Sequence, residues 1–268
     1  MPLSADRAAL DMLDAHLEDL WGGTDLPPPQ GFRLAACEAN ELARWALARL
    51  QSLPREPGDA FVREVGSLLA EFRSRRCAWN AAALHLLDDT YAFVATGPRR
   101  HEDWAHDVLA VLHRSVPDPR GWVRLDRDRT NTARHTVPAY PFDPPDASVL
   151  PSRLYPLKAE AAVTALAVMA EEWQSEPAPV RSRPDRDALL TDARTLLGRY
   201  GPAAHYWTNA TTAASDPAPD FLAAGLQGTG SHRFLTSEYL DGLDLLEELG
   251  LIAVTDDEVG VFWSIGAY

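Results

Sequence analysis

The stretch that decides the fold reads LDGLDLLEELGLIAVTDDEVGVFW and spans Leu240 to Trp263. Its leucines recur at helical spacing, so we expect a helix that Thr236 caps and Gly250 ends. Two runs rich in β-branched and aromatic residues follow, at 251–255 and 259–265, on either side of an acidic turn. They predict an antiparallel β-hairpin. The inward positions of the expected helix are Tyr239, Leu240, Leu243, Leu246 and Leu249.

This expected helix and hairpin resemble the third helix and wing of winged-helix domains, where a Leu-Glu-x-Leu-Gly-Leu-Ile run leads into the hairpin. The resemblance extends back to about Asp185 if the helix that begins there is the first helix of the domain. Winged helices that bind DNA place basic side chains on this helix and wing. Residues 235–268 contain eight acidic residues and no lysine or arginine, which disfavours direct DNA binding by this segment.

Upstream, amphipathic helical segments alternate with proline and glycine breaks. One expected helix contains Trp79, Leu86 and Phe93, and the next runs from Trp104 to Leu112. Pro156 is expected in the first turn of a further helix. We therefore predict a mainly α fold, with a multi-helix N-terminal part and a C-terminal winged-helix-like helix plus hairpin. Its three parts are a helical domain at 1–137, a Pro-rich crossover with one helix at 138–184, and a winged-helix-like subdomain at 185–268.

Composition and charge restrict the class of protein. The 268 residues are 46% apolar and 24% charged, as in an ordinary globular protein. The net charge of −14 argues against broad binding to nucleic acids or anionic membranes. Lys158 is the single lysine against 24 arginines, a bias typical of GC-rich bacterial genes. The two cysteines, Cys37 and Cys77, lie in apolar helical patterns, and no signal peptide or membrane span is evident. We expect a bacterial, cytoplasmic protein.

Two short motifs are weak candidates for metal binding. The stretch HEDWAHD at 101–107 holds histidines five residues apart, whereas the zinc-protease pattern needs a spacing of four. We interpret it instead as the N-terminus of a helix, where Glu102 and Asp103 interact favourably with the positive end of the helix dipole. The stretch LDDTYA at 87–92 resembles the start of the aspartate-rich motif of terpene synthases, but Ala92 replaces the third carboxylate. No cofactor is expected, and the metal candidates are Asp88, Asp89, His101 and His106.

Arginines gather between residues 73 and 134, where 11 arginines exceed 8 acidic residues. The loop from Arg120 to Arg134 is therefore a candidate site for an anion or a phosphorylated partner. The residues that would bind the anion are Arg124, Arg127 and Arg129. Pairing of these arginines with acids of the same chain is the simpler interpretation.

The acidic excess favours a non-enzymatic interaction protein, such as an adaptor, a regulatory subunit or an inhibitor of the immunity type. Its partner would be a protein, and a basic one in particular. The residues expected to bind it are Asp241, Asp244, Glu247 and Glu248 on the terminal helix. One alternative is a small metal-dependent enzyme built on Asp88 and Asp89 or on His101 and His106. A second alternative is a nucleic-acid-linked regulator that uses the Arg120–Arg134 loop.

Overall fold

The structure is a computed structural model, and it describes residues 67, 71, 74, 78–87, 92–116, 142–171, 178–234 and 248–265. By its internal contacts the chain divides into two compact units, Met1–Cys77 and Ala78–Tyr268. Almost all described residues belong to the second unit. The helices predicted before residue 67 and the Arg120–Arg134 loop lie outside the described residues.

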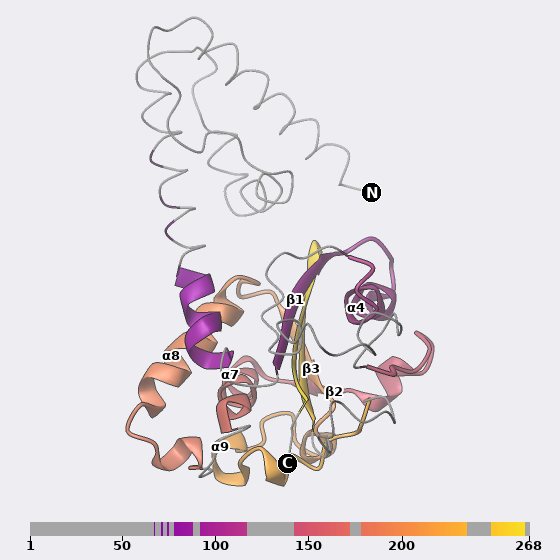
Figure 1. The fold of residues 1–268 in the computed structure, drawn as a ribbon. Coiled ribbons are helices and arrows are strands. Elements are labelled where there is room, and N and C mark those ends of the chain that lie inside the picture. The colour runs from indigo at the N-terminus through magenta and orange to yellow at the C-terminus, as the bar shows by residue number, and fades with distance from the viewer. Residues whose placement is uncertain are drawn as a thin grey trace, which may run out of the picture. The chain divides into compact units, whose positions relative to one another are not determined.

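A five-stranded antiparallel sheet organises the described part of the second unit (Figure 1). The strands follow the order β1-β5-β4-β3-β2, so the hairpin of β4 and β5 occupies the centre. This confirms the hairpin predicted from the sequence. The strands are β1 (Ala92–Pro98), β2 (Tyr155–Leu157), β3 (His205–Thr208), β4 (Leu249–Val254) and β5 (Glu258–Ser264).

Helices cover both faces of this sheet. The helical residues 78–87 lie with α7, α8 and α9 on one face, and α4 lies on the other (Figure 1). The helices are α4 (Trp104–Leu112), α7 (Ala159–Val168), α8 (Arg186–Gly198) and α9 (Phe221–Ala224). Short 3₁₀ turns join them: η1 (Leu150–Arg153), η2 (Met169–Glu171), η3 (Val180–Ser182), η4 (Thr211–Ala214) and η5 (Gln227–Thr229).

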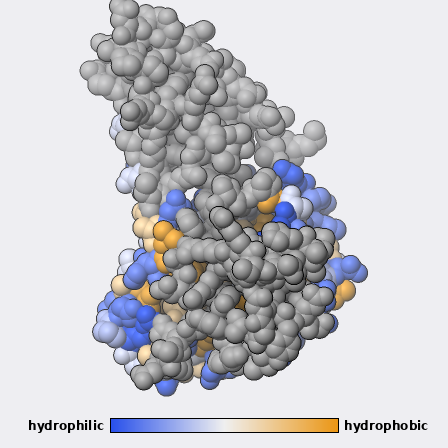
Figure 2. All heavy atoms as spheres, viewed as in Figure 1, coloured by the Kyte–Doolittle hydropathy of each residue, from blue (hydrophilic) through white to orange (hydrophobic). Residues whose placement is uncertain are grey.

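The central strands are buried on both faces, which explains their almost continuous apolar sequence. Side chains of a strand alternate between the two faces. Leu251 and Phe262 therefore join the core under α7 and α8, whereas Ile252 and Val261 join the core under α4. In the view of Figure 2, the visible surface near α8 and α4 is mostly hydrophilic. None of the described helices is long and apolar enough to cross a membrane.

The expected C-terminal helix does not reach Gly250. Leu249 and Gly250, predicted as an inward helix position and the helix-ending glycine, are the first two residues of β4. Gly250 pairs with Trp263 on β5. A Cβ atom at Gly250 would lie 2.2–2.4 Å from three atoms of the Trp263 ring, so the indole occupies the space that a side chain would need. Packing of this ring, rather than a helix end, explains the glycine.

The mainly α prediction is wrong. About 46% of the described residues are helical and 20% are in strands. Phe93, predicted in a helix, belongs to β1, and Pro156, predicted to begin a helix, belongs to β2. The hairpin is not a peripheral wing, because β1 and β3 flank it on both sides. A winged-helix-like arrangement is therefore also incorrect.

Other parts of the sequence-based fold agree with the structure. Helices form at residues 78–87, at α4 and at α8, where apolar spacing predicted them. Strands from all three predicted parts of the chain pair in one sheet. β1 comes from 1–137, β2 from 138–184, and the other three strands from 185–268.

Candidate functional site

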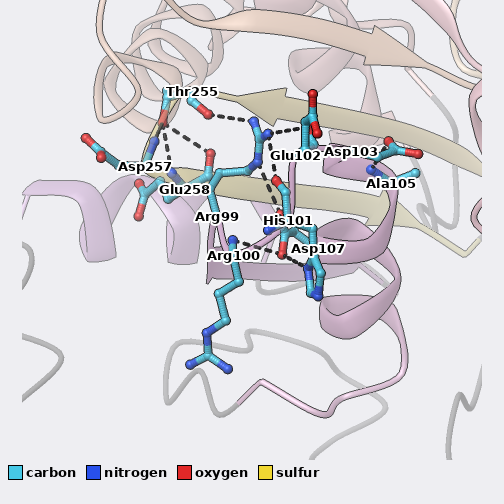
Figure 3. Close-up of polar contacts among 10 residues, drawn as sticks. All are labelled: Arg99, Arg100, His101, Glu102, Asp103, Ala105, Asp107, Thr255, Asp257 and Glu258. Carbon is cyan, nitrogen blue, oxygen red and sulfur yellow. Dashed lines mark hydrogen bonds and ion pairs between the residues drawn. The ribbon is translucent and has the colours of Figure 1, made fainter. Parts of the chain in front are cut away.

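A buried carboxylate, Asp107, organises the start of α4 (Figure 3). Its side chain is 2% exposed. Its Oδ1 accepts hydrogen bonds from the backbone N–H of Arg100 (3.1 Å) and from Nδ1 of His101 (2.7 Å). Its Oδ2 accepts from Nε of Arg99 (3.2 Å) and from the backbone N–H of His101 (3.3 Å). One carboxylate thus fixes three consecutive residues between β1 and α4.

Arg99 links this segment to the turn between β4 and β5. Its guanidinium donates to the backbone carbonyls of Thr255 (3.0 Å), His101 (3.2 Å) and Glu102 (3.0 Å). Its backbone N–H donates to the carbonyl of Asp257 (2.8 Å). Figure 3 shows the Arg99 side chain reaching across this group of residues, whereas the Arg100 side chain points away from it. The β4–β5 turn and the start of α4 therefore form one hydrogen-bonded framework.

The local sequence explains why α4 begins where it does. Asp103 is the N-cap residue, and its side chain accepts a hydrogen bond from the N–H of Ala105 at 2.9 Å. This agrees with the interpretation of the HEDWAHD stretch as a helix N-terminus. Val108 and Leu112 face the sheet and are fully buried. The outer surface of α4 carries His106 and Ala110, and His113 follows at its C-terminal end.

An open hollow of about 730 Å³ runs along that outer surface of α4. We call it the α4 hollow. Prolines 144 and 145 stiffen its opposite wall, and the N–H groups of Val149 and Leu150 both donate to the carbonyl of Asp146 (2.8 and 2.9 Å). The backbone N–H of Asp143 also donates to the carbonyl of Phe234. The hollow is lined by Asp103, His106, Leu109, Ala110, His113, Ser115, Pro144, Pro145, Asp146, Ala147 and Ser148.

Among the described lining residues of the α4 hollow, the formally charged side chains are both aspartates. Asp103 and Asp146 are exposed and come from opposite walls. The described lining residues include no lysine or arginine. His106 and His113 both line the hollow, as expected for histidines that share a helix face.

The structure brings His101 and His106 together. Their ring centres are 5.4 Å apart and their planes are inclined by 44°. A continuous helix would have turned side chains five residues apart away from each other. His101 instead lies in the bend before α4, where Asp107 holds its ring beside that of His106. Within the described ranges, no group of three or more histidine, cysteine, aspartate or glutamate residues is arranged to hold a metal ion.

The other predicted site residues are placed as follows. Glu248 is 2% exposed, and its Oε2 accepts a hydrogen bond from Nε1 of Trp263 at 2.9 Å. It therefore lies in the interior and does not form part of an exposed acidic face. The remaining candidates lie outside the described residues: Asp88, Asp89, Arg124, Arg127, Arg129, Asp241, Asp244 and Glu247.

Sequence analysis missed Asp107 and the wall around Asp146. A signal for Asp107 was present, because it lies between Trp104 and Val108 on the side of the helix that carries the apolar residues. An acid in that position is a buried charge that needs partners. Asp146 had no comparable signal, since a loop of prolines and small residues does not reveal which helix it faces.

The resolved pKa shifts belong to residues of other parts of the fold. A hydrogen bond from Arg183 lowers the pKa of Asp185, and the same bond raises the pKa of Arg183. Burial raises the pKa of Tyr206 on β3. These three groups report on folding rather than on the α4 hollow.

No model of a known protein family matches the chain, and comparisons with curated proteins and with solved structures find no match either. The geometry of the described residues is therefore the basis for the functional proposal.

Proposed function

We propose that this protein is a non-enzymatic interaction protein, an adaptor, regulatory subunit or inhibitor, whose α4 hollow binds a basic segment of a partner protein. The observation that carries the proposal is that Asp103 and Asp146, which come from two different segments, both line the hollow, and that its described lining residues include no lysine or arginine. A lysine or arginine side chain from a partner would meet a carboxylate on each wall. Charge complementarity of this kind supplies specificity and speeds association.

The shape of the α4 hollow also fits a peptide side chain. Its volume of about 730 Å³ is within the range usual for binding pockets. Leu109, Pro144 and Pro145 offer apolar surface, against which the methylene groups of a lysine or arginine pack while the charged end reaches an aspartate. A site with both features accommodates the whole side chain rather than the charge alone.

The framework beside the hollow is held in place before a partner binds. Asp107 and Arg99 fix the start of α4 against the β4–β5 turn. Glu102 and Asp257 are exposed in the same group of residues, on the start of α4 and on the β4–β5 turn. A preorganised site loses less conformational entropy on binding than a flexible one.

The remaining features of the chain fit this role. The net charge of −14 draws basic partners over distances of about a Debye length, ~8 Å at physiological salt. The two cysteines suit a reducing compartment, so we place the interaction in the bacterial cytoplasm. Partner contacts by Asp241, Asp244 and Glu247 stay a separate prediction.

The test compares partner capture by three forms of the full-length protein. The site variant carries Asp103→Asn and Asp146→Asn. Asparagine caps helices about as well as aspartate, so α4 keeps its start. The control carries Asp187→Asn and Asp216→Asn, which remove the same charge from exposed positions outside the hollow.

A partner is captured from host lysate with the wild-type protein, identified by mass spectrometry, purified and titrated against all three forms by calorimetry. We expect the site variant to bind at least tenfold more weakly and the control to bind within twofold of the wild type. A tenfold change corresponds to about 1.4 kcal/mol. Equal affinity of the site variant and the control would show that net charge, and not the α4 hollow, determines binding.

A further inference from the structure

We infer that His101 and His106 form a binding site for a divalent transition-metal ion of the kind that prefers imidazole, with Zn²⁺ as the first case to test. His106 also lines the α4 hollow, but the inference rests on the geometry of the two rings and not on the proposed partner. It starts from the distance of 5.4 Å between the two ring centres. Two imidazoles bound to one tetrahedral Zn²⁺ through nitrogens at about 2.0–2.1 Å have ring centres about 5 Å apart. The separation of the two ring centres is therefore close to that of a pair bound to one ion.

The Asp107 carboxylate prepares His101 for this role. Since Nδ1 of His101 donates to Oδ1 of Asp107 (2.7 Å), the proton resides on Nδ1 and the lone pair on Nε2. Metal-binding histidines characteristically donate their other ring nitrogen to a carboxylate, which orients the ring and strengthens the ligand. Asp107 is 2% exposed and accepts three further hydrogen bonds, so its own position is fixed.

The site is open on the solvent side. The side chain of His101 is 53% exposed, and His106 is also exposed. Arg99 carries a positive charge in this cluster, and its ion pair with Asp107 offsets that charge. Because no third protein ligand of the described ranges joins the pair, water occupies the remaining coordination positions. Two imidazoles with water select Zn²⁺, Ni²⁺ or Cu²⁺ over Mg²⁺ or Ca²⁺, which prefer oxygen ligands.

The test titrates the metal-free, full-length protein with Zn²⁺ by calorimetry, with Mg²⁺ as the comparison ion. The site variants are His101→Ala and His106→Ala, each made singly. The matched control is His113→Ala, since His113 is an exposed histidine at the other end of α4. Circular dichroism confirms that each variant is folded.

We expect one Zn²⁺ to bind per chain through this pair, with affinity at least tenfold lower in either site variant and unchanged in the control. A Zn²⁺ titration followed by NMR of the histidine rings gives a second readout, in which the resonances of His101 and His106 shift together. Zn²⁺ affinity that survives both site substitutions would overturn the inference. So would the absence of Zn²⁺ binding to the wild type, or ring shifts confined to other histidines.

Discussion

Replacing Asp107 by asparagine tests whether this carboxylate holds the start of α4. Each of its oxygens accepts two hydrogen bonds, Oδ1 from Arg100 and His101 and Oδ2 from Arg99 and His101. The amide of asparagine has one oxygen and one NH₂ group. Whichever way it turns, the NH₂ group faces two donors, so two of the four bonds are lost.

The cost follows from these losses. The side chain of Arg99 is 16% exposed, and its guanidinium loses its negatively charged partner. Breaking a buried pair by removing one charge costs about 3–5 kcal/mol. For a protein of this size about 1 kcal/mol lowers the melting temperature by roughly 2–4 °C. We therefore expect Asp107→Asn to melt about 6–20 °C below the wild type.

The assay is thermal unfolding followed by circular dichroism, with hydrogen exchange to assign the transition to residues 78–268. Asp103→Asn is the control, because it makes the same chemical change four residues earlier, at an exposed cap that asparagine also serves. It is expected to shift the free energy of unfolding by less than about 0.5 kcal/mol. A difference of about 2 °C or less between the melting temperatures of the two variants corresponds to about 1 kcal/mol or less. That result would show that the role assigned to Asp107 is wrong.

Three further predictions test packing and ionisable groups in other parts of the fold. Gly250→Ala places a methyl group within 2.4 Å of a buried indole ring, so we expect it to lower the free energy of unfolding, measured by chemical denaturation, by at least about 1–3 kcal/mol. The control is Gly198→Ala in α8, where nothing lies within 4 Å of the added Cβ, and we expect it to raise that free energy by about 0.5–1 kcal/mol. A Gly250→Ala variant more stable than Gly198→Ala would refute the packing described for Trp263. Arg183 lowers the pKa of Asp185, so the ionised carboxylate stabilises the fold above about pH 4, and this stabilisation is lost as pH falls through the lowered pKa. We expect Asp185→Asn to reduce the loss of unfolding free energy measured between pH 6 and pH 2. The same loss in the variant and the wild type would contradict this. Burial raises the pKa of Tyr206, so we expect the free energy of unfolding to fall as pH rises above about 10, where this tyrosine ionises first in the unfolded chain. We expect Tyr206→Phe to remove that decline. The same decline in the variant and the wild type would argue against this role of Tyr206.

The elements that the sequence predicted are those set by local pattern. Spacing of apolar residues identified α4 and α8, and the alternating runs around residues 256–258 identified the β4–β5 hairpin. Strand β1 was not predicted, because residues 78–87 are helical and no proline or glycine separates them from Phe93. Its conformation depends on pairing with β5, more than 150 residues away, which no local window contains.

The helix predicted before the hairpin wrongly included Leu249 and ended at Gly250, for a related reason. Leu249 fits a helical leucine repeat and the start of a strand equally well, and pairing with β5 decides between them. Strand β2 was also assigned to a helix, because Pro156 is common in the first turn of a helix. β2 is an edge strand, and an edge strand tolerates a proline that would be unusual in a central one. Both errors replaced strand by helix and led to the mainly α prediction.

The candidate site was only partly visible in the sequence. His101 and His106 stood out as a pair, but their spacing within one helix argued against a shared position. That reasoning assumed that His101 lies in the helix, whereas Asp103 caps α4 two residues later. Glu248 was taken for a surface acid because its neighbours are acidic, yet the indole of Trp263 binds it in the interior. Neither placement follows from helical spacing alone, since Asp107 holds the ring of His101 and Trp263 binds the side chain of Glu248.

The most direct test of the account is hydrogen–deuterium exchange of the full-length protein, alone and bound to its purified partner. The account predicts that binding slows exchange in residues 103–115 and 146–148, which line the α4 hollow. Slower exchange confined to other segments, such as 235–247, with the hollow unchanged, would contradict it and would move the partner to the acidic residues of the C-terminal part.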